Sequence, residues 1–361
     1  MTAHARWQMK AAVLFSGADI RVQTVPDLKP GPGEVLCRVG AAGICGSDLH
    51  GYRAAKAGRP RAPWMPYPHV APGHELAGTV VALGEGVVGL KEGDRVGIEP
   101  LVGCGKCEYC RVGQYHICPK LEHIGGARSG GFAEYTVAPQ DKCFVLPESI
   151  GFDEASTLDC AAVGVHALHR VPVKPADTVA VYGTGAIGLY TAAVARAVGA
   201  KKVIVVGGRR EMPLRVASEM GAHHTVNSSQ QDPVKAIRDL TDGRGADVVF
   251  ETVGGTADTY GRCIQSARTG GVIGNVASFG TPQTIETWPL LRQELSQVWV
   301  WSYAMWGTEP EYKTALDMLA DGRIKALPMI THRFPLDEIA EAFEAADDKG
   351  QSDSIKVCVI P

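Results

Sequence analysis

Four closely spaced cysteines constrain this chain more than any other feature of its sequence. They follow the pattern C-x2-C-x2-C-x7-C and lie at Cys104, Cys107, Cys110 and Cys118. Thiolates at this spacing suit a tetrahedral zinc site in which all four positions are filled by protein. Because such a site has no position left for substrate, we predict a structural zinc. Taken alone, the cluster would fit a small zinc-binding lobe in a protein of any function.

The length and charge of the chain limit what it can be. With 361 residues it is long enough for two domains, each with a core of its own. Its net charge of −3 gives no reason to expect nucleic acid as a partner. Residues 1–10 lack an apolar signal segment, and the weakly polar run 179–195 is interrupted by glycines. We therefore expect a cytoplasmic protein that does not span a membrane.

The pattern of the chain changes near residue 153. Up to about residue 147 it consists of short β-type runs bounded by Gly and Pro, which predicts an antiparallel, barrel-like β domain. Further on, apolar strands alternate with helices, as in a doubly wound α/β domain with a parallel sheet; the strands expected are 179–182, 203–206, 247–250 and 272–275. We expect domains at 1–158 and 159–302, with 303–361 returning to the first domain through a strand at 356–359.

A glycine-rich loop joins the first of these strands to a helix. It reads Gly-Thr-Gly-Ala-Ile-Gly, and its binding positions are Gly183, Gly185, Ala186, Ile187 and Gly188. The first glycine permits a tight turn, the second lets a pyrophosphate approach the backbone, and the third lets helix and strand pack closely. The helix N-terminus then faces the phosphates. This placement predicts a dinucleotide site.

The end of the next strand bears on the choice of dinucleotide. An NAD site usually carries a carboxylate there to bind the adenosine ribose, but this chain has Gly208, Arg209 and Arg210. Gly208 leaves space for a 2′-phosphate, and Arg209 can bind it through two hydrogen bonds. The alternative is that both arginines are simply solvated at a helix start, where cations oppose the helix dipole. We favour NADP(H) over NAD(H).

Two further motifs indicate a second metal. Cys45 lies in a Gly-rich loop, followed by Ser47, Asp48 and His50, and His74-Glu75 follows a glycine. The second motif is not a metalloprotease H-E-x-x-H helix, because Gly78 occupies the second histidine position. Single Cys or His residues are more often structural than ligating, so these two motifs alone do not establish a site.

Together with the cysteine cluster, the glycine-rich loop and the run Gly93 to Val96, these motifs resemble the zinc-containing medium-chain alcohol and polyol dehydrogenases. The resemblance covers about Met9 to Pro361. It implies a β-rich GroES-like catalytic domain, a Rossmann domain and a catalytic zinc with an open fourth position. By the resemblance, Cys45 and His74 are zinc ligands, and Asp48 orients His74.

The third ligand expected from the resemblance differs from that of the alcohol-oxidising members. The corresponding position is Asp159, and polyol and threonine dehydrogenases also place a carboxylate there. Cys160, the next residue, is the alternative. By the same resemblance Glu75 is either a ligand that alternates on the zinc or an acceptor that never touches it.

The resemblance also assigns the remaining roles. Ser47 takes the proton of the alcohol and passes it through the nicotinamide ribose to His50, which exchanges it with water; His50 as an ordinary surface histidine remains the alternative. The nicotinamide is expected beside the strand end formed by Val276, Ala277 and Ser278. Lys356 stands where relatives have a basic residue near the pyrophosphate.

The sequence does not identify the substrate. Ser302 replaces an arginine found near this point in sorbitol dehydrogenases, and the aromatic run 299–303 either lines the site or packs between subunits. We expect an oxidoreductase that uses zinc and NADP(H) on a secondary alcohol or cyclic polyol, assembled as a homodimer or homotetramer. The alternatives are an NAD-linked polyol, amino-sugar or threonine-type dehydrogenase, a dinucleotide-binding protein without chemistry, and a zinc-ribbon protein that binds nucleic acid.

Overall fold

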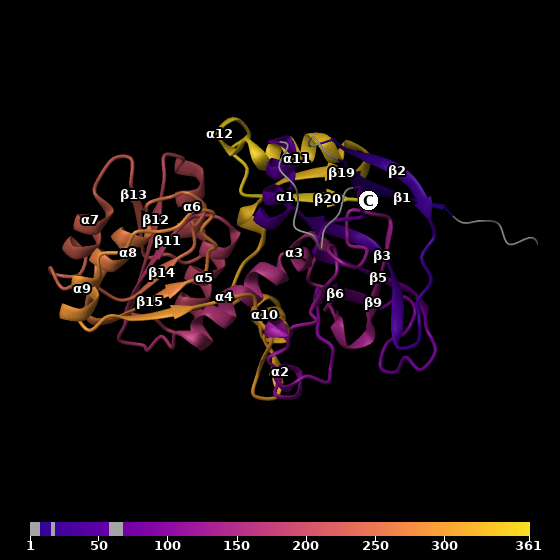
Figure 1. Cartoon of the computed structure of the whole chain (residues 1–361), viewed down its shortest axis with the longest axis horizontal. Helices are drawn as coiled ribbons and strands as arrows, with labels where there is room; N and C mark the ends of the chain where they lie inside the picture. Colours follow the sequence, from indigo (N-terminus) through magenta and orange to yellow (C-terminus); the bar gives the residue numbers. More distant parts are fainter. Residues whose placement is uncertain (1–7, 16–18, 58–67) are drawn as a thin grey trace, which may run out of the picture. The chain divides into compact units, whose positions relative to one another are not determined.

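The computed structural model describes residues 8–15, 19–57 and 68–361, and these residues form two compact units (Figure 1). The first unit comprises the chain up to Asp159 together with Ile330–Pro361, and the second comprises Cys160–Met329. The chain thus returns to the first unit at Ile330 and not at residue 303, where the sequence placed the return.

The later return has a physical cause in the second unit. The carboxylate of Glu311, which is fully buried, accepts hydrogen bonds from Nδ1 of His166 at 2.8 Å and from Nδ1 of His169 at 2.7 Å. The backbone N–H of Ala304 donates to the same carboxylate at 2.7 Å. Because both histidines lie on the first long helix of the second unit, these contacts keep the segment after residue 302 there.

The first unit is built on strands that run mostly antiparallel. A seven-stranded sheet has the order β10-β6-β5-β3-β20-β19, with β9 also paired to β3, and a smaller sheet has the order β2-β1-β4. Apart from the parallel pair β19–β20, this is the antiparallel β domain expected from the sequence. The strands are β1 (Gln8–Leu14), β2 (Ile20–Pro26), β3 (Glu34–Gly43), β4 (His69–Val70), β5 (Glu75–Leu83), β6 (Arg95–Ile98), β7 (Leu101–Val102), β8 (Glu122–His123), β9 (Tyr135–Pro139), β10 (Cys143–Val145), β19 (Ile330–Pro335) and β20 (Lys356–Ile360).

Helices pack against the strands of this unit. The apolar side chains that alternate along β3 and β5 pack with the buried face of α11, so one core serves both the N-terminal and the C-terminal parts of the chain. The α-helices are α1 (Gly46–Lys56), α2 (Glu108–Arg111), α3 (Phe152–Ser156), α11 (Ile339–Asp347) and α12 (Lys349–Ser352), and helix α4 (Leu158–Arg170) starts here and continues into the second unit.

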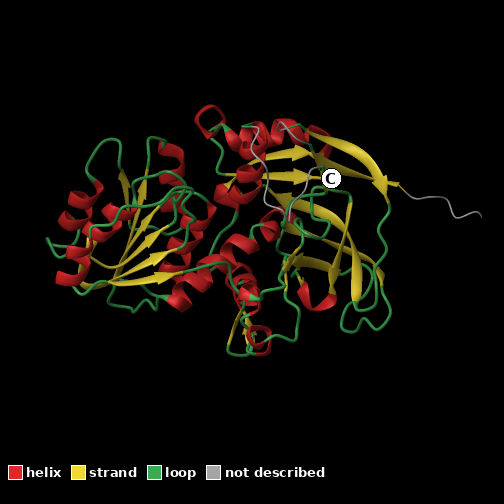
Figure 2. Ribbon diagram, in the orientation of Figure 1, coloured by secondary structure: helices red, strands yellow, loops and turns green. Residues whose placement is uncertain are grey.

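The second unit is the predicted doubly wound domain. Its six parallel strands have the order β13-β12-β11-β14-β15-β16, and helices cover both faces of the sheet (Figure 2). The central strands are buried at every position and mostly apolar, because both faces are covered. The elements are β11 (Thr178–Tyr182), α5 (Ala186–Ala197), β12 (Lys202–Gly207), α6 (Glu211–Glu219), β13 (His224–Asn227), α7 (Pro233–Asp239), β14 (Ala246–Glu251), α8 (Tyr260–Ser266), β15 (Ala267–Asn275), α9 (Thr287–Arg292), β16 (Ser296–Trp299), β17 (Met305–Trp306), β18 (Glu309–Pro310) and α10 (Glu311–Ala320).

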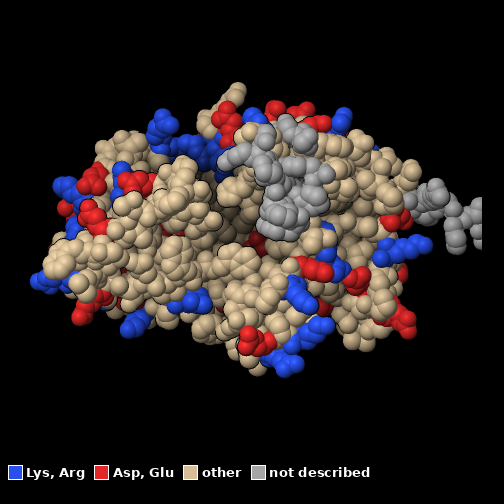
Figure 3. All heavy atoms as spheres, in the orientation of Figure 1, with Lys and Arg blue, Asp and Glu red and all other residues tan. Residues whose placement is uncertain are grey.

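Among the described residues, no helix is long and apolar enough to cross a bilayer. Residues 1–7, which belong to the N-terminal stretch considered above, lie outside the described residues. On the face drawn in Figure 3, basic and acidic side chains both occur over each unit, in keeping with the small net charge.

Candidate zinc and dinucleotide sites

The four clustered cysteines meet in a lobe of the first unit. Their sulfur atoms lie within 4.8 Å of one another, as one tetrahedral zinc ion requires. Cys118 Sγ accepts backbone N–H groups from Cys104 at 3.5 Å and Lys120 at 3.3 Å, and Cys107 Sγ accepts that of Cys110 at 3.4 Å. Such donors favour the thiolate form, so the lobe fits zinc.

Backbone N–H groups also act on Cys104. Hydrogen bonds from the backbone of Lys106, and next from that of Cys107, lower the pKa of Cys104 to about 6. A thiolate at neutral pH is the form in which cysteine binds metal.

A second candidate metal site lies where α1 begins and β5 begins. Cys45 is the residue that precedes the first turn of α1, and His74 immediately precedes β5. Ligand atoms of Cys45, His74 and Glu75 lie within 4.8 Å of one another. Although burial alone would lower the pKa of His74, the nearby Cys45 and Asp48 raise it well above its usual value. Negative groups that would stabilise a protonated imidazole also stabilise a bound cation, so this cluster fits a metal ion.

Asp48 and Ser47 lie on opposite sides of the His74 ring. Asp48 Oδ1 is 3.7 Å from His74 Nδ1, and Asp48 Oδ2 accepts the backbone N–H of Cys45 at 3.0 Å. Ser47 Oγ is 3.4 Å from His74 Nε2. Asp48 therefore contacts both predicted ligands, and the Ser47 hydroxyl stands on the side of the ring left for metal. His50 lies on the exposed side of α1.

Asp159 is near the start of α4 and joins this cluster. Glu75 and Asp159 form part of a further group of potential ligands, again with atoms within 4.8 Å of one another. Cys160 follows Asp159 in the same helix, and its Sγ lies within the same distance of the Asp159 carboxylate. The geometry therefore brings Asp159 close to Glu75. It does not decide whether Asp159 or Cys160 is the third ligand.

Lys356 is found in different surroundings from those that the sequence suggested. It was expected near the pyrophosphate, but its side chain is 2% exposed and its Nζ lies 2.5 Å from Oε2 of Glu75. The Glu75 side chain is itself fully buried. In this structure the lysine is part of a buried ion pair directly behind the metal cluster.

His123 also lies beside this cluster, and the sequence analysis missed it. Its ring packs edge-on against His74, with ring centroids 4.9 Å apart. Burial, and next the neighbouring His74, lower the pKa of His123 to about 3. His123 is on β8, which pairs with β7 at the base of the cysteine lobe. No motif marks it; its only signal is that it follows the last cysteine closely.

The glycine-rich loop of the second unit has the geometry of a phosphate cradle. Gly183 has φ +122°, and a Cβ there would lie 2.3 Å from Thr252 Oγ1. A Cβ on Gly188 would lie 2.3 Å from the Gly183 carbonyl oxygen, whereas a Cβ on Gly185 would meet nothing within 4 Å. The first and third glycines are thus required by close packing, and the space above the second is open to a ligand. Ala186 and Ile187 form the first turn of α5.

The tip of β12 is open as well. Gly208 follows the strand and a Cβ there would meet nothing within 4 Å, while Arg209 is exposed and Arg210 is the residue before the first turn of α6. The N–H of Ser228, which follows β13, donates to the carbonyl of Gly207 at the end of β12, at 2.9 Å. Strand β15 leads into Val276, whose N–H bonds Glu251, and into Ala277 and Ser278 at the same carboxyl edge of the sheet.

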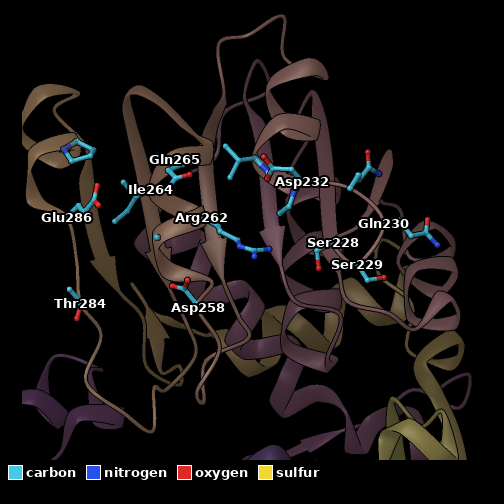
Figure 4. A pocket seen from close by; sticks show the side chains of 15 residues that line it. Ser228, Ser229, Gln230, Asp232, Asp258, Arg262, Ile264, Gln265, Thr284 and Glu286 are labelled. Atoms are coloured by element: carbon cyan, nitrogen blue, oxygen red, sulfur yellow. The ribbon is translucent and has the colours of Figure 1, made fainter.

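A cavity of about 710 Å³ opens beside Ser228 and continues along α7 and α8 (Figure 4). Its lining is polar and includes Ser229, Asp258 and Arg262, and the Arg262 side chain extends between Asp258 and Ser228. The glycine-rich loop is not among its lining residues. The cavity therefore adjoins the β13 side of the carboxyl edge, not the phosphate cradle.

Comparisons with known proteins agree with the description of each of the two units. The family profile described as "Alcohol dehydrogenase GroES-like domain" matches residues 31–148, and that described as "Zinc-binding dehydrogenase" matches residues 186–321. Sorbitol dehydrogenase of Bacillus subtilis is 34% identical over 100% of this chain and 99% of its own length. L-threonine 3-dehydrogenase of Pyrococcus horikoshii is 34% identical over 91% of this chain and 91% of its own length.

A solved structure extends the likeness to three dimensions. A zinc-binding dehydrogenase from Sinorhizobium meliloti, bound to NADP, superposes with a TM-score of 0.86 at 33% identity and covers 99% of this chain and 100% of its own. Both the fold and the resemblance predicted from the sequence are therefore confirmed. The chain belongs to the zinc-containing medium-chain alcohol and polyol dehydrogenase family, and it is an NAD(P)-linked oxidoreductase of small-molecule alcohols.

Proposed function

We propose that this enzyme interconverts a secondary alcohol or cyclic polyol and its ketone with NADP(H), at a zinc ion bound by Cys45, His74 and Asp159. The observation that carries the proposal is that two groups of potential ligands share Glu75: Cys45 and His74 lie within 4.8 Å of it and of each other, and so do Asp159 and Cys160. Three protein ligands leave a fourth position for the substrate oxygen. The four-cysteine lobe takes the structural zinc.

The chain's own residues provide the path for the proton. When bound, zinc polarises the substrate oxygen and the nicotinamide takes up the hydride. Ser47, whose hydroxyl is 3.4 Å from His74 Nε2, accepts the proton that the alcohol loses and at the same time releases its own hydroxyl proton toward His50. His50, exposed on the same helix, passes that proton to water. Asp48 holds the His74 ring by its contact with Nδ1.

The preference for NADP(H) rests on the tip of β12. Gly208 leaves open space where a carboxylate would repel a 2′-phosphate, and Arg209 is exposed beside it. A guanidinium binds phosphate through paired hydrogen bonds. We assign the pyrophosphate to the loop from Gly183 to Gly188, and the nicotinamide to the edge formed by Val276, Ala277 and Ser278. The adenosine end then points toward the side of the sheet where the Ser228 cavity opens.

A screen of alcohols, polyols and amino sugars with the purified protein tests the proposal, with NADP⁺ and NAD⁺ compared for each compound by absorbance of the reduced cofactor. We expect turnover of a secondary alcohol or polyol, faster with NADP⁺. Turnover only of an amino acid such as threonine, with NAD⁺, would favour the second candidate, an NAD-linked threonine-type dehydrogenase. The likeness to L-threonine 3-dehydrogenase supports that candidate.

The second unit also supports self-association. Trp299, Trp301 and Trp306 are each more than half exposed, and large aromatic side chains are enriched at subunit interfaces. We propose a homodimer or homotetramer, which light scattering during gel filtration would reveal. None of the ten cysteines forms a disulfide, and a reducing compartment such as the cytoplasm suits them.

A further inference from the structure

Glu211 follows two arginines directly, yet its carboxylate is bound by neutral amides. It comes after Arg209 and Arg210 and is the first residue of α6. Its Oε1 accepts hydrogen bonds from Nδ2 of Asn227 at 2.7 Å and from Nε2 of Gln230 at 3.0 Å. Within the part of the chain that the structure describes, the exposed Arg209 forms no ion pair. The amides therefore take the place that a neighbouring guanidinium would usually have beside a carboxylate.

The position of Asn227 determines where this carboxylate lies. Strands β12 and β13 are parallel, and Gly207 at the end of β12 is paired with Asn227 at the end of β13. Asn227 is 6% exposed, and its Oδ1 accepts the backbone N–H of Ser229 at 3.0 Å and the Ser229 hydroxyl at 2.6 Å. Because these two donors fix the amide oxygen, the NH₂ group is left to donate to Glu211. The Glu211 carboxylate is thus held at the end of β13.

Without these amides the carboxylate would have a charged partner close by along the chain. Glu211 is two residues from Arg209, and an ion pair between them would occupy the donors that we assign to the 2′-phosphate. It would also bring a negative charge toward a phosphate that itself carries roughly −1.5 to −2. A carboxylate that only stabilised the N-terminus of α6 through the helix dipole would affect both dinucleotides alike.

We propose that Asn227 is a positioning residue for cofactor choice: with Gln230 it holds the Glu211 carboxylate at the end of β13, so that Arg209 stays available to the 2′-phosphate. The inference rests on the proposed binding of NADP(H) at the tip of β12. Asn227 acts through Glu211 and needs no contact with the cofactor. Its signature is a change in the affinity for NADPH that NADH does not share, because NADH lacks the 2′-phosphate.

Titration of the whole chain with NADPH and with NADH, followed by quenching of the protein fluorescence, gives the two Kd values. Asn227→Asp is the main variant, because it keeps the oxygen that Ser229 binds but replaces the donor to Glu211 by a second carboxylate. We expect the Kd of NADPH to rise at least about fivefold, since an exposed ion pair formed with Arg209 and repulsion of the phosphate act in the same direction. The Kd of NADH should change by less than about twofold.

Three further variants show whether the effect passes through Glu211 and Arg209. Asn227→Asp combined with Glu211→Gln exchanges the amide and the carboxylate at unchanged net charge, and should bring the Kd of NADPH back to within about twofold of the unmodified protein. In an Arg209→Ala background, Asn227→Asp should change the Kd of NADPH by less than about twofold, because no guanidinium is left to pair with Glu211. Gln230→Ala removes only the second donor, at an exposed position, and should raise the Kd of NADPH about twofold without affecting NADH.

The proposal is wrong if Asn227→Asp leaves the ratio of the two Kd values unchanged in a protein that prefers NADPH. It is also wrong if the variant with the exchanged groups binds NADPH as weakly as Asn227→Asp alone, because the carboxylate introduced at position 227 would then repel the phosphate directly. If Asn227→Asp does not fold, Gln230→Ala decides, and an unchanged Kd of NADPH in that variant contradicts the proposal. Unmodified protein that binds NADH as tightly as NADPH would instead refute the proposed cofactor, before any variant is considered.

Discussion

The imidazole of His123 packs edge-on against that of His74, with ring centroids 4.9 Å apart and ring planes inclined at 67°. Burial, and next His74, lower the pKa of His123 to about 3, which favours the neutral ring at neutral pH. Its contact with the proposed ligand is therefore one of packing, not charge.

Replacing His123 by alanine should loosen His74 and lower kcat/KM. Aromatic pairs contribute roughly 0.5–1.5 kcal/mol beyond their area, which corresponds to about a 2- to 10-fold effect. His123→Phe keeps the ring and should stay close to the unmodified enzyme, with an unchanged pH profile above about pH 5. Steady-state kinetics of both variants decide the matter, and a large loss in His123→Phe would assign a polar role to the imidazole.

Two zinc ions of different lability are expected per chain. The ion held by Cys104, Cys107, Cys110 and Cys118 should resist chelators and be needed for folding, because the protein closes its shell. The ion at Cys45, His74 and Asp159 should be removable with loss of turnover but with retention of the circular dichroism spectrum. Elemental analysis before and after chelation measures this, and active protein with a single zinc would contradict it.

The third ligand can be identified by paired substitutions. Asp159→Ala should lose the labile zinc and at least about 100-fold in kcat, since even residues that only support a ligand cost 10- to 100-fold. Cys160→Ala, the matched control one residue on, should retain the metal and most of the activity. The reverse pattern would make Cys160 the ligand.

Cofactor choice should depend on Gly208 and Arg209. Hydrogen bonds to charged groups contribute about 1.5–3 kcal/mol each, so NADPH should be preferred at least about tenfold in kcat/KM. Arg209→Ala should weaken the use of NADPH and leave that of NADH nearly unchanged. Gly208→Asp combined with a neutral residue at 209 should reverse the preference, because the new carboxylate repels the 2′-phosphate. Equal efficiency with both cofactors in the unmodified enzyme would mean that the arginines are merely solvated.

Glu311 should stabilise the second unit in a pH-dependent way. Burial alone would raise its pKa, but hydrogen bonds from His166 and then His169 outweigh burial and lower it to about 2 from 4.5. A carboxylate whose pKa is lower in the folded state stabilises above its unfolded pKa and loses that contribution as the pH falls from 4.5 toward 2. The shift corresponds to about 3 kcal/mol.

Glu311→Gln should therefore lower the melting temperature clearly at pH 7, and the difference from the unmodified protein should start to narrow below about pH 4.5. Thermal melts at a series of pH values provide the measurement. Lys313→Gln, which removes an exposed charge on the same helix, is the control and should have little effect. A difference that stays constant from pH 7 to pH 3 would mean that the carboxylate charge contributes nothing.

The features that could be predicted from the sequence are those that depend on residues close together along the chain. The spacing of the cysteines and the glycine pattern at residues 183–188 each specify a local geometry, and the alternation of strands and helices specified the parallel sheet. The contacts that were missed join distant segments: Lys356 to Glu75, His123 to His74, and Glu311 to His166. Nothing near residue 356 in the sequence shows that a glutamate will lie opposite it, so a basic residue there was interpreted as cofactor-binding.

The pairing of β7 with β8 connects the cysteine lobe to the proposed metal cluster of Cys45, His74 and Glu75. Leu101 and His123 lie opposite each other at the base of the lobe, and a Cβ on Gly125 would lie only 2.4 Å from the carbonyl oxygen of Gly73, next to His74. An ion that orders the lobe is therefore expected also to order the wall of the proposed catalytic site. Coupling free energies are reciprocal, so we expect each zinc ion to raise the affinity of the protein for the other.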